Sequence, residues 1–206
     1  MADDESQEAR VILPSPVVSA QWVAEHIDQV RLVDVRWAMD GGPKRSDFEA
    51  GHLPGAVFAD LDVDLSDPPG TRGRHPLPSA EDFAVVRGRL GLAEVPVVAY
   101  DDQSGAVAGR LWWMLDAIGQ PAAVLDGGIQ AWAGQLETGP GAEPDGAAPE
   151  PVPWPEDRFV DIDGVLAAID QGGVLVDARS HERFIGTPNP IDPRPGHVPG
   201  ARSRPW

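Results

Sequence analysis

The segment LVDVR, residues 32–36, returns later in the chain as LVDAR, residues 175–179. A second segment behaves in the same way, because GHLPGA at 51–56 returns as GHVPGA at 196–201. The aspartate and the histidine of the two segments are 18 residues apart in the first copy and 20 in the second. Two blocks that recur in the same order at nearly the same spacing indicate a tandem repeat of one domain.

Around the first copy, short apolar runs alternate with segments that have helical periodicity. We expect strands at 32–35, 57–59, 97–100 and 122–125. We expect helices after N-caps at Ser19 and Ser79, over 105–118, and in a short stretch around Trp132. Strands that alternate with helices predict an α/β fold, with a largely parallel sheet covered by helices on both faces.

The repeat also predicts the domain organisation. We expect a disordered acidic tail at 1–10, a complete domain at 11–137, a linker at 138–158 rich in Pro, Gly and acidic residues, and the start of a second domain at 159–206. The second copy has no counterpart of residues 60–136. We therefore expect the chain to be the N-terminal portion of a longer, truncated protein.

Composition and charge exclude several classes of protein. The 206 residues carry a net charge of −17, which disfavours binding to nucleic acid or to an anionic membrane surface. No apolar run is long enough to span a bilayer, and the acidic N-terminus does not resemble a secretory signal. These features predict a cytoplasmic protein with no nucleic-acid or membrane partner.

The chain contains no cysteine. This count excludes disulfides, thiolate metal sites and a cysteine nucleophile within these residues. The five histidines do not have the spacing of metal ligands. We expect neither a metal nor a cofactor.

Three further segments follow the repeated blocks of the first copy in order: VVAYDDQSG at 97–105, GRLWWML at 109–115 and VLDGGIQAW at 124–132. Together these motifs resemble the tandem-domain rhodaneses, the thiosulfate and 3-mercaptopyruvate sulfurtransferases. The resemblance covers nearly the whole chain, and it implies one complete rhodanese-like domain plus the N-terminal part of a second.

The resemblance also implies an activity. Members of this family move a sulfane sulfur from a small anionic donor, such as thiosulfate or 3-mercaptopyruvate, to a thiol or to cyanide. A cysteine in a loop between a strand and a helix of the second domain carries the sulfur as a persulfide, and backbone N–H groups stabilise its thiolate.

Asp101 stands where an active domain of this family has its cysteine. A carboxylate is a poor sulfur acceptor, so we favour a role as a cap of the following helix over a role as a novel nucleophile. The first domain then resembles the inactive member of the pair, and the chain as given is predicted to be inactive.

The resemblance implies three substrate-binding residues. Arg183 matches an arginine beside the active cysteine, where its guanidinium can bind the oxygens of a donor. Arg194 lies near the place of a second arginine that binds the substrate carboxylate, although the loop around it aligns poorly. Trp37 matches an aromatic residue of the interdomain cleft, and an ordinary packing role is the alternative for it.

Four repeated residues have structural roles in our interpretation. Asp34 and Asp177 each end an apolar strand, and His52 and His197 each lie in the Gly-His-x-Pro-Gly-Ala turn. A catalytic carboxylate pair is the alternative for the aspartates. Because the same residues occur in a domain that is predicted to be inert, we expect them to hold each domain together.

A second function stays open beside the enzymatic one. A non-catalytic rhodanese-like module that binds a partner or senses an anion would also lack the cysteine. The related use of this fold in phosphatases needs a loop cysteine as well, and the chain has none.

Overall fold

The computed structural model describes residues 11–93, 95–144, 146–192 and 194–205. The predicted tail at 1–10 lies outside the described residues. The chain divides into two compact units, of which the first runs up to Trp154 and the second begins at Pro155. Each unit is described by itself.

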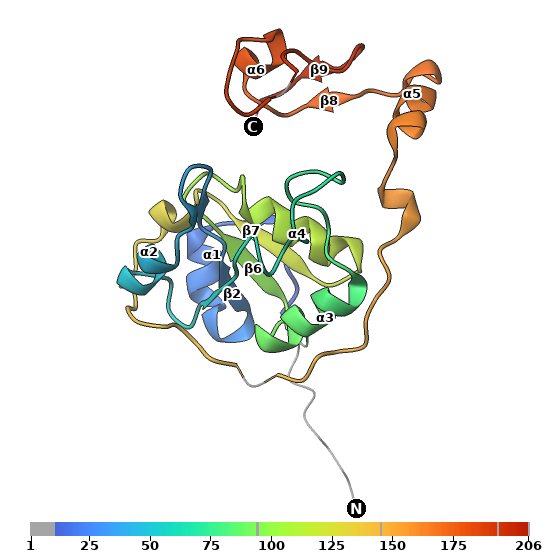
Figure 1. The fold of residues 1–206 in the computed structure, drawn as a ribbon. Helices are drawn as coiled ribbons and strands as arrows, with labels where there is room; N and C mark the ends of the chain where they lie inside the picture. The colour runs from blue at the N-terminus through green and yellow to red at the C-terminus, as the bar shows by residue number, and fades with distance from the viewer. Residues whose placement is uncertain (1–10, 94, 145, 193, 206) are drawn as a thin grey trace, which may run out of the picture. The chain divides into compact units, whose positions relative to one another are not determined.

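The first unit is built on a five-stranded sheet in which every neighbouring pair of strands is parallel (Figure 1). The strand order is β1-β7-β6-β2-β5. The strands are β1 (Val17–Val18), β2 (Arg31–Asp34), β5 (Val57–Phe58), β6 (Val97–Tyr100) and β7 (Ala122–Leu125). This arrangement confirms the predicted α/β fold with a parallel sheet.

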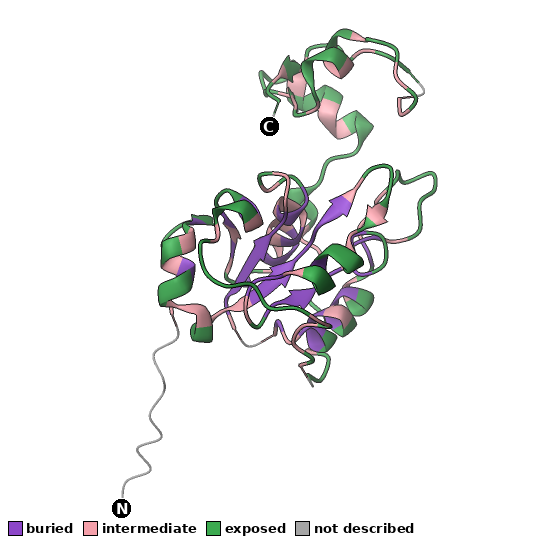
Figure 2. Cartoon of the chain, turned by 90° about the vertical axis from the view of Figure 1, so that its left-hand side faces the viewer, coloured by how far each residue is buried: buried purple, intermediate pink, exposed green. Residues whose placement is uncertain are grey.

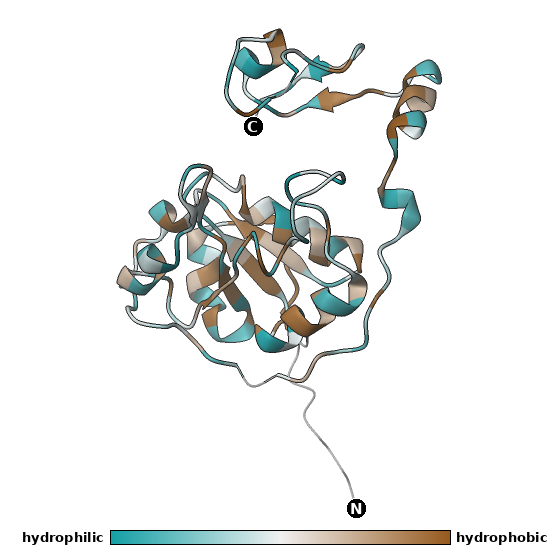
Figure 3. Cartoon of the chain, in the orientation of Figure 1, coloured by the Kyte–Doolittle hydropathy of each residue, from teal (hydrophilic) through white to brown (hydrophobic). Residues whose placement is uncertain are grey.

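Helices cover both faces of this sheet. Successive residues of a strand point to opposite sides, so each buried strand packs against helices on both faces. The helices are α1 (Ala20–Glu25), α2 (Arg45–Ala50), α3 (Ala80–Arg89) and α4 (Ala108–Ala117). Val23 of α1 and Phe48 of α2 pack in one core with Leu32 and Val98. The adjacent strand residues, such as Val33, pack in a second core with the apolar side chains of α3 and α4. Figures 2 and 3 show the strands as the buried and apolar centre of this unit.

Several local predictions are confirmed. Ser19 Oγ accepts a hydrogen bond from Trp22 N at 3.1 Å, and Ser79 Oγ accepts one from Asp82 N at 3.0 Å. The helix predicted over 105–118 begins only at Ala108, because the preceding residues form a tight loop. A 3-10 helix, η2 (Gly128–Ala131), precedes Trp132.

The sequence-based prediction lacks some short elements of the first unit. It left 36–51 as a polar stretch, where the structure has α2 and an antiparallel pair of two-residue strands, β3 (Trp37–Ala38) and β4 (Gly42–Pro43). It also missed the edge strand β1. The helix expected up to Gln29 is divided into α1 and the 3-10 helix η1 (Ile27–Gln29). Two or three residues do not establish a periodicity, and α2 has six residues of which only Phe48 is buried, so no apolar pattern marked these elements.

The segment predicted as a linker lies against the first unit for most of its length. Gly139 N donates to Glu49 O at 2.8 Å, and Ala142 N donates to Ala56 O at 3.0 Å. Trp154 stacks on Phe83 with ring centroids 5.3 Å apart. The division between the units therefore falls at Trp154, whereas the sequence placed the end of the first domain at residue 137.

The second unit repeats the first elements of the first unit. It contains η3 (Glu156–Arg158), α5 (Ile162–Asp170), β8 (Val176–Asp177), α6 (His181–Ile185) and β9 (Arg202–Ser203). Strands β8 and β9 are parallel, as are β2 and β5. None of the described helices in either unit is long and apolar enough to cross a membrane.

The two copies differ in how far they bury equivalent side chains. Val33 is fully buried, whereas the equivalent Val176 is 51% exposed. Leu53 is fully buried, whereas the equivalent Val198 is 49% exposed. No described residue from Pro155 onward is buried, as Figure 2 shows. The second unit thus has the local contacts of the repeat without the core that covers them in the first.

We predict that brief digestion with proteinase K leaves a resistant fragment that ends near Trp154. Proteases cleave where the backbone is exposed and weakly packed, and residues 138–154 are bonded to the first unit while the residues beyond are not buried. Mass spectrometry of the fragment gives its end. A fragment that ends near residue 137 would contradict the packing of this segment.

Candidate functional site

The loop between β6 and α4 forms a cup of backbone N–H groups at the carboxyl end of the sheet. Asp101, fully buried, lies in this cup. Its Oδ1 accepts hydrogen bonds from Gln103 N and Gly105 N, both at 2.9 Å. Its Oδ2 accepts from Val107 N at 2.8 Å and from Ala108 N at 2.9 Å. Four main-chain donors therefore converge on one carboxylate.

The cup is held by η2, which follows the neighbouring strand β7. Ile129 N donates to the main-chain oxygen of Asp101 at 2.9 Å. Gly128 has a φ of +58°, and a Cβ there would lie 2.3 Å from the same oxygen. Only glycine allows this close approach, which explains the second glycine of the Asp-Gly-Gly sequence after β7.

The geometry of the cup favours a negative charge. N–H groups that point to one place form an anion-binding concavity, and the N-terminus of α4 adds the positive end of a helix dipole. In this chain the carboxylate of Asp101 supplies that charge. Because Val107 has no side-chain cap to offer, Asp101 satisfies the first N–H groups of α4 from outside the helix.

Side chains beside the cup are tied to one another. Lys44 Nζ lies 2.5 Å from Asp102 Oδ2, and Gln103 Nε2 donates to the main-chain oxygen of Trp37 at 2.5 Å. Trp37 is 9% exposed, and its Nε1 donates to Asp62 Oδ2 at 2.9 Å. The structure thus places Trp37 next to the cup in a packed position. Sequence reasoning did not single out Lys44, Asp102 or Asp62, because their partners lie far away along the chain, 58 residues apart for Lys44 and Asp102 and 25 for Trp37 and Asp62.

Asp34 and Arg36 form a clasp at the end of β2. Arg36 Nε lies 3.1 Å from Asp34 Oδ1 and 2.9 Å from Oδ2, and Arg36 N donates to Oδ1 at 2.9 Å. Arg36 Nη2 lies 2.8 Å from Asp34 Oδ2 and also donates to Gly51 O at 2.7 Å. The clasp therefore ties the strand to the Gly-His-x-Pro-Gly-Ala turn.

The second unit builds the same clasp. Arg179 Nε lies 2.9 and 3.1 Å from the two carboxylate oxygens of Asp177, and Arg179 Nη2 donates to Gly196 O at 2.8 Å. A strand, a turn and the ion pair that joins them are thus reproduced atom for atom.

The two histidines also make equivalent contacts. His52 Nδ1 lies 2.8 Å from Phe48 O, and the two rings stack with centroids 4.0 Å apart. His197 Nδ1 lies 2.8 Å from Phe184 O, and those rings stack at 3.7 Å. Because a carbonyl oxygen can only accept, each Nδ1 carries the proton. The contacts of all four repeated residues lie within their own unit.

Burial gives the two clasp aspartates opposite pKa shifts. Burial raises the pKa of Asp34 despite its hydrogen bonds to Arg36, and burial with the nearby Asp34 charge also raises the pKa of Tyr100. Hydrogen bonds from Arg179 lower the pKa of Asp177, which is only partly buried. Both aspartates have the same arginine contacts, so the direction of the pKa shift depends on how far burial removes water from the carboxylate.

Of the two arginines predicted to bind substrate, Arg183 is already occupied. Its Nε lies 2.8 Å from Asp192 Oδ2 and its Nη2 lies 2.6 Å from Asp192 Oδ1. Arg194 is exposed and lines a hollow of about 620 Å³ that Asp177 and His197 also line. The second unit therefore brings Arg194 close to the clasp and gives Arg183 an internal partner.

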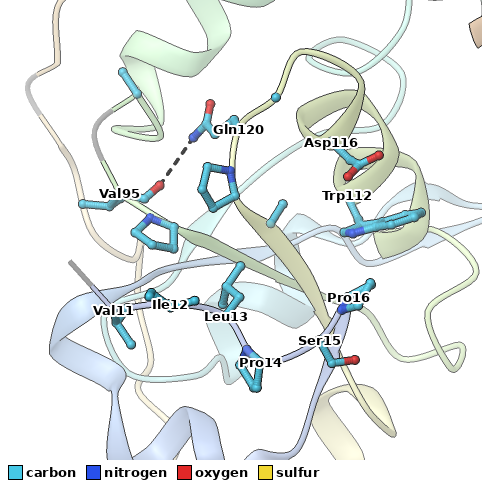
Figure 4. A pocket seen from close by; sticks show the side chains of 15 residues that line it. Val11, Ile12, Leu13, Pro14, Ser15, Pro16, Val95, Trp112, Asp116 and Gln120 are labelled. Atoms are coloured by element: carbon cyan, nitrogen blue, oxygen red, sulfur yellow. Dashed lines mark hydrogen bonds between the residues drawn. The ribbon is translucent and has the colours of Figure 1, made fainter.

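A different hollow, of about 600 Å³, lies in the first unit where β6 and β7 begin, at the end of these strands that is opposite to the cup (Figure 4). Trp112, Leu13, Pro14 and Gln120 are among its lining residues. None of the residues predicted from the sequence lines it. Among the residues that the structure describes, no group of three or more histidine, aspartate or glutamate side chains could hold a metal ion.

Comparison with known proteins places this site in a family. The profile of the rhodanese-like domain matches residues 19–135. The chain therefore belongs to the rhodanese-like domain family.

Its relatives carry the names of sulfurtransferases. The chain is 41% identical over 183 residues to the SseB protein of Mycobacterium tuberculosis, provisionally named a thiosulfate sulfurtransferase, with 84% of this chain and 63% of the relative covered. It is 35% identical over 203 residues to the 3-mercaptopyruvate sulfurtransferase of Escherichia coli K12, with 92% and 70% covered. The chain thus spans about 63% of the length of the mycobacterial relative.

Solved structures agree with the sequence comparison. The 3-mercaptopyruvate sulfurtransferase of Leishmania major aligns with a TM-score of 0.80 at 36% identity, with 92% of this chain and 54% of that chain covered. The enzyme SseA of Escherichia coli aligns with a TM-score of 0.76 at 33% identity, with 93% and 75% covered. Family and fold therefore follow from two independent comparisons.

We predict that the pKa of the Asp34 carboxyl lies above that of an ordinary aspartate and that the pKa of the Asp177 carboxyl lies below it. Asp177 therefore stabilises its unit above the unfolded pKa of about 4, and that contribution is lost as the pH falls through the lowered folded pKa. Asp34 has the opposite sign, because its raised pKa makes ionisation in the folded state costly. Carboxyl carbon NMR across a pH series measures both. Equal pKa values in the two units would contradict the role of burial.

We predict that Asp101→Ala lowers the free energy of unfolding of the first unit by roughly 2–4 kcal/mol, because four N–H groups lose their acceptor in a buried place. Asp101→Asn should cost less, since the amide keeps one acceptor oxygen. Urea unfolding measures both. The exposed Asp40→Asn removes a charge elsewhere in the first unit and serves as the control. An Asp101→Ala protein as stable as this control would contradict the importance of the carboxylate.

Proposed function

We propose that the chain is the N-terminal portion of a sulfurtransferase that moves sulfane sulfur from thiosulfate or 3-mercaptopyruvate to a thiophilic acceptor, and that its first unit is a non-catalytic support. The cup around Asp101 carries the proposal, because it combines the family's loop with a residue that cannot hold sulfur. The names of the relatives support the class of reaction.

The chemistry explains why a sulfur nucleophile is needed. A thiolate attacks the outer sulfur of thiosulfate, the sulfur–sulfur bond of the donor breaks, and sulfite leaves with the bonding electron pair. The persulfide then passes its outer sulfur to cyanide or to a thiol, and the thiolate returns. The carboxylate of Asp101 has no sulfur atom to accept this transfer, and its charge repels an anionic donor. The thiolate must therefore come from outside these residues.

The substrate-binding roles of Arg183, Arg194 and Trp37 belong to the same proposal. A guanidinium binds a carboxylate or sulfonate group through two parallel hydrogen bonds, which fits Arg183 and Arg194. Trp37 is packed beside the cup, and its indole N–H already has a partner in Asp62. For Trp37 the packing alternative therefore has direct support from its contacts.

A non-catalytic rhodanese-like binding module is the second candidate. One observation favours it: Asp101 satisfies all four donors of the cup, so the first unit is complete without a substrate. Such a module binds a partner or an anion and has no turnover in any longer form of the protein. Sulfur transfer by a longer form distinguishes the two functions.

We predict that residues 1–206 release no thiocyanate from thiosulfate and cyanide above the uncatalysed rate, because no thiolate is available. The colour of the iron–thiocyanate complex measures the product. Turnover would show that a residue other than cysteine carries sulfur, and it would overturn the proposal.

We also predict that Asp101→Cys gains the mass of one sulfur atom after incubation with thiosulfate, whereas the unchanged chain does not. The cup should lower the pKa of the new thiol and stabilise the persulfide anion. Mass spectrometry of the intact protein detects the adduct. A Ser104→Cys chain is the matched control, since this exposed residue lies in the same loop outside the converging N–H groups. An equal gain in both variants would mean that the cup contributes nothing.

A further inference from the structure

The carboxylate of Asp192 occupies the fork of Arg183. The two hydrogen bonds, at 2.8 and 2.6 Å, use both oxygens of the carboxylate and two nitrogens of the guanidinium. This is the bidentate arrangement in which an arginine binds a free carboxylate or a sulfonate group. While Asp192 is in place, Nε and Nη2 of Arg183 cannot form the same pair of hydrogen bonds with another anion.

The loop around Asp192 is built to hold this position. Asn189 Oδ1 accepts from Asp192 N at 2.9 Å, and Asn189 Nδ2 donates to Asp192 Oδ2 at 3.0 Å. Asp192 lies nine residues from Arg183 along the chain, so the carboxylate stays close to the guanidinium at a high effective concentration. Hydrogen bonds from Arg183 also hold the pKa of Asp192 well below its usual range, so the carboxylate is ionised at neutral pH.

Asp192 also balances the charge of the whole cluster. Arg179 Nη1 lies 3.5 Å from Asp192 Oδ2, which joins the Arg183 pair to the clasp of Asp177 and Arg179. Two carboxylates and two guanidinium groups have no net charge. An anionic donor that approaches a neutral cluster gains little attraction, and the surrounding chain is strongly acidic.

We propose that Asp192 is an internal competitor for the oxyanion group of the sulfur donor, so that Arg183 binds a donor only when the carboxylate of Asp192 has moved away. This inference rests on the proposed function, because it takes Arg183 as a donor-binding residue. Asp192 is then a specificity-determining residue. A group with two coplanar oxygens, such as the carboxylate of 3-mercaptopyruvate or the oxygens of thiosulfate, can replace it in the fork, whereas a monatomic anion cannot.

The competition lowers the apparent affinity for a donor, because only the fraction of molecules in which the fork of Arg183 is free can bind it. Asp192→Asn keeps the size of the side chain but offers one acceptor oxygen in place of two, and it leaves the cluster with one net positive charge. We predict that this variant of the chain 1–206 binds thiosulfate and 3-mercaptopyruvate about tenfold more tightly than the unchanged chain. NMR titration with each donor separately gives the dissociation constants and shows which oxyanion is preferred.

Four further chains make the result specific. Arg183→Leu alone removes the fork from the otherwise unchanged chain and shows whether donors use it. Asp192→Glu keeps a carboxylate on the loop and should bind as weakly as the unchanged chain. Asp170→Asn removes an equal charge from an exposed position of the same unit and should show no gain. Asp192→Asn combined with Arg183→Leu should lose the gain, because the fork is gone. The ring resonance of His197, stacked on Phe184, shows in each case that the unit is folded.

The outcomes separate the inference from the proposed function. A gain confined to Asp192→Asn and abolished by Arg183→Leu supports both. If Asp192→Asn has no gain while Arg183→Leu alone weakens binding, the competitor role is overturned and the donor role of Arg183 stands. An equal gain in Asp170→Asn also overturns the competitor role, because charge alone would explain it. If Arg183→Leu changes binding in neither background, both ideas are wrong and the pair with Asp192 is structural.

Discussion

Four buried backbone N–H groups that point to one place need a hydrogen-bond acceptor between them, and the structure of the loop after β6 depends on that acceptor. In this chain the carboxylate of Asp101 accepts all four hydrogen bonds. The same contacts begin α4, end β6 and fix the loop against η2 through Ile129. The requirement is for a negative charge and not for a particular chemistry. A sulfur anion and a carboxylate can therefore occupy the same loop, and only the first can transfer sulfur.

Comparison of the two copies of the repeat shows which contacts form locally and which burial needs the whole domain. The clasp and the histidine stack form in both units, although the second buries none of its described residues. A short strand, a turn and two paired side chains are enough to specify these contacts. The burial of Val33 needs the strands and helices that follow, and the equivalent Val176 remains exposed. The repeated motif thus stabilises the edge of a domain before the core is present.

The sequence predicted the layers of the fold and the anchors of its elements, because these depend on periodicity and on single capping residues. All four predicted strands agree with the structure to within one residue at each end, and the caps at Ser19 and Ser79 are confirmed. The packing of 138–154 could not be predicted, because it depends on distant glycines such as Gly88, where a Cβ would lie 2.6 Å from Ala148 N. Pairs such as Arg183 with Asp192 were equally hidden, since the charges lie in a loop without a pattern.

Each unit has a carboxylate at a position where the proposed function would place an anion, and the two carboxylates differ in how firmly they are held. Asp101 is fully buried and bonded to a loop that starts a helix, so its removal disrupts the unit. Asp192 lies on a loop, where its carboxylate contacts the side chains of Arg183, Asn189 and Arg179. The clasp of Asp177 and Arg179 has hydrogen bonds of its own, so it does not depend on Asp192. Because a free anion can compete only with a group that can leave, the proposed exchange between a donor and the internal ion pair belongs to the second unit.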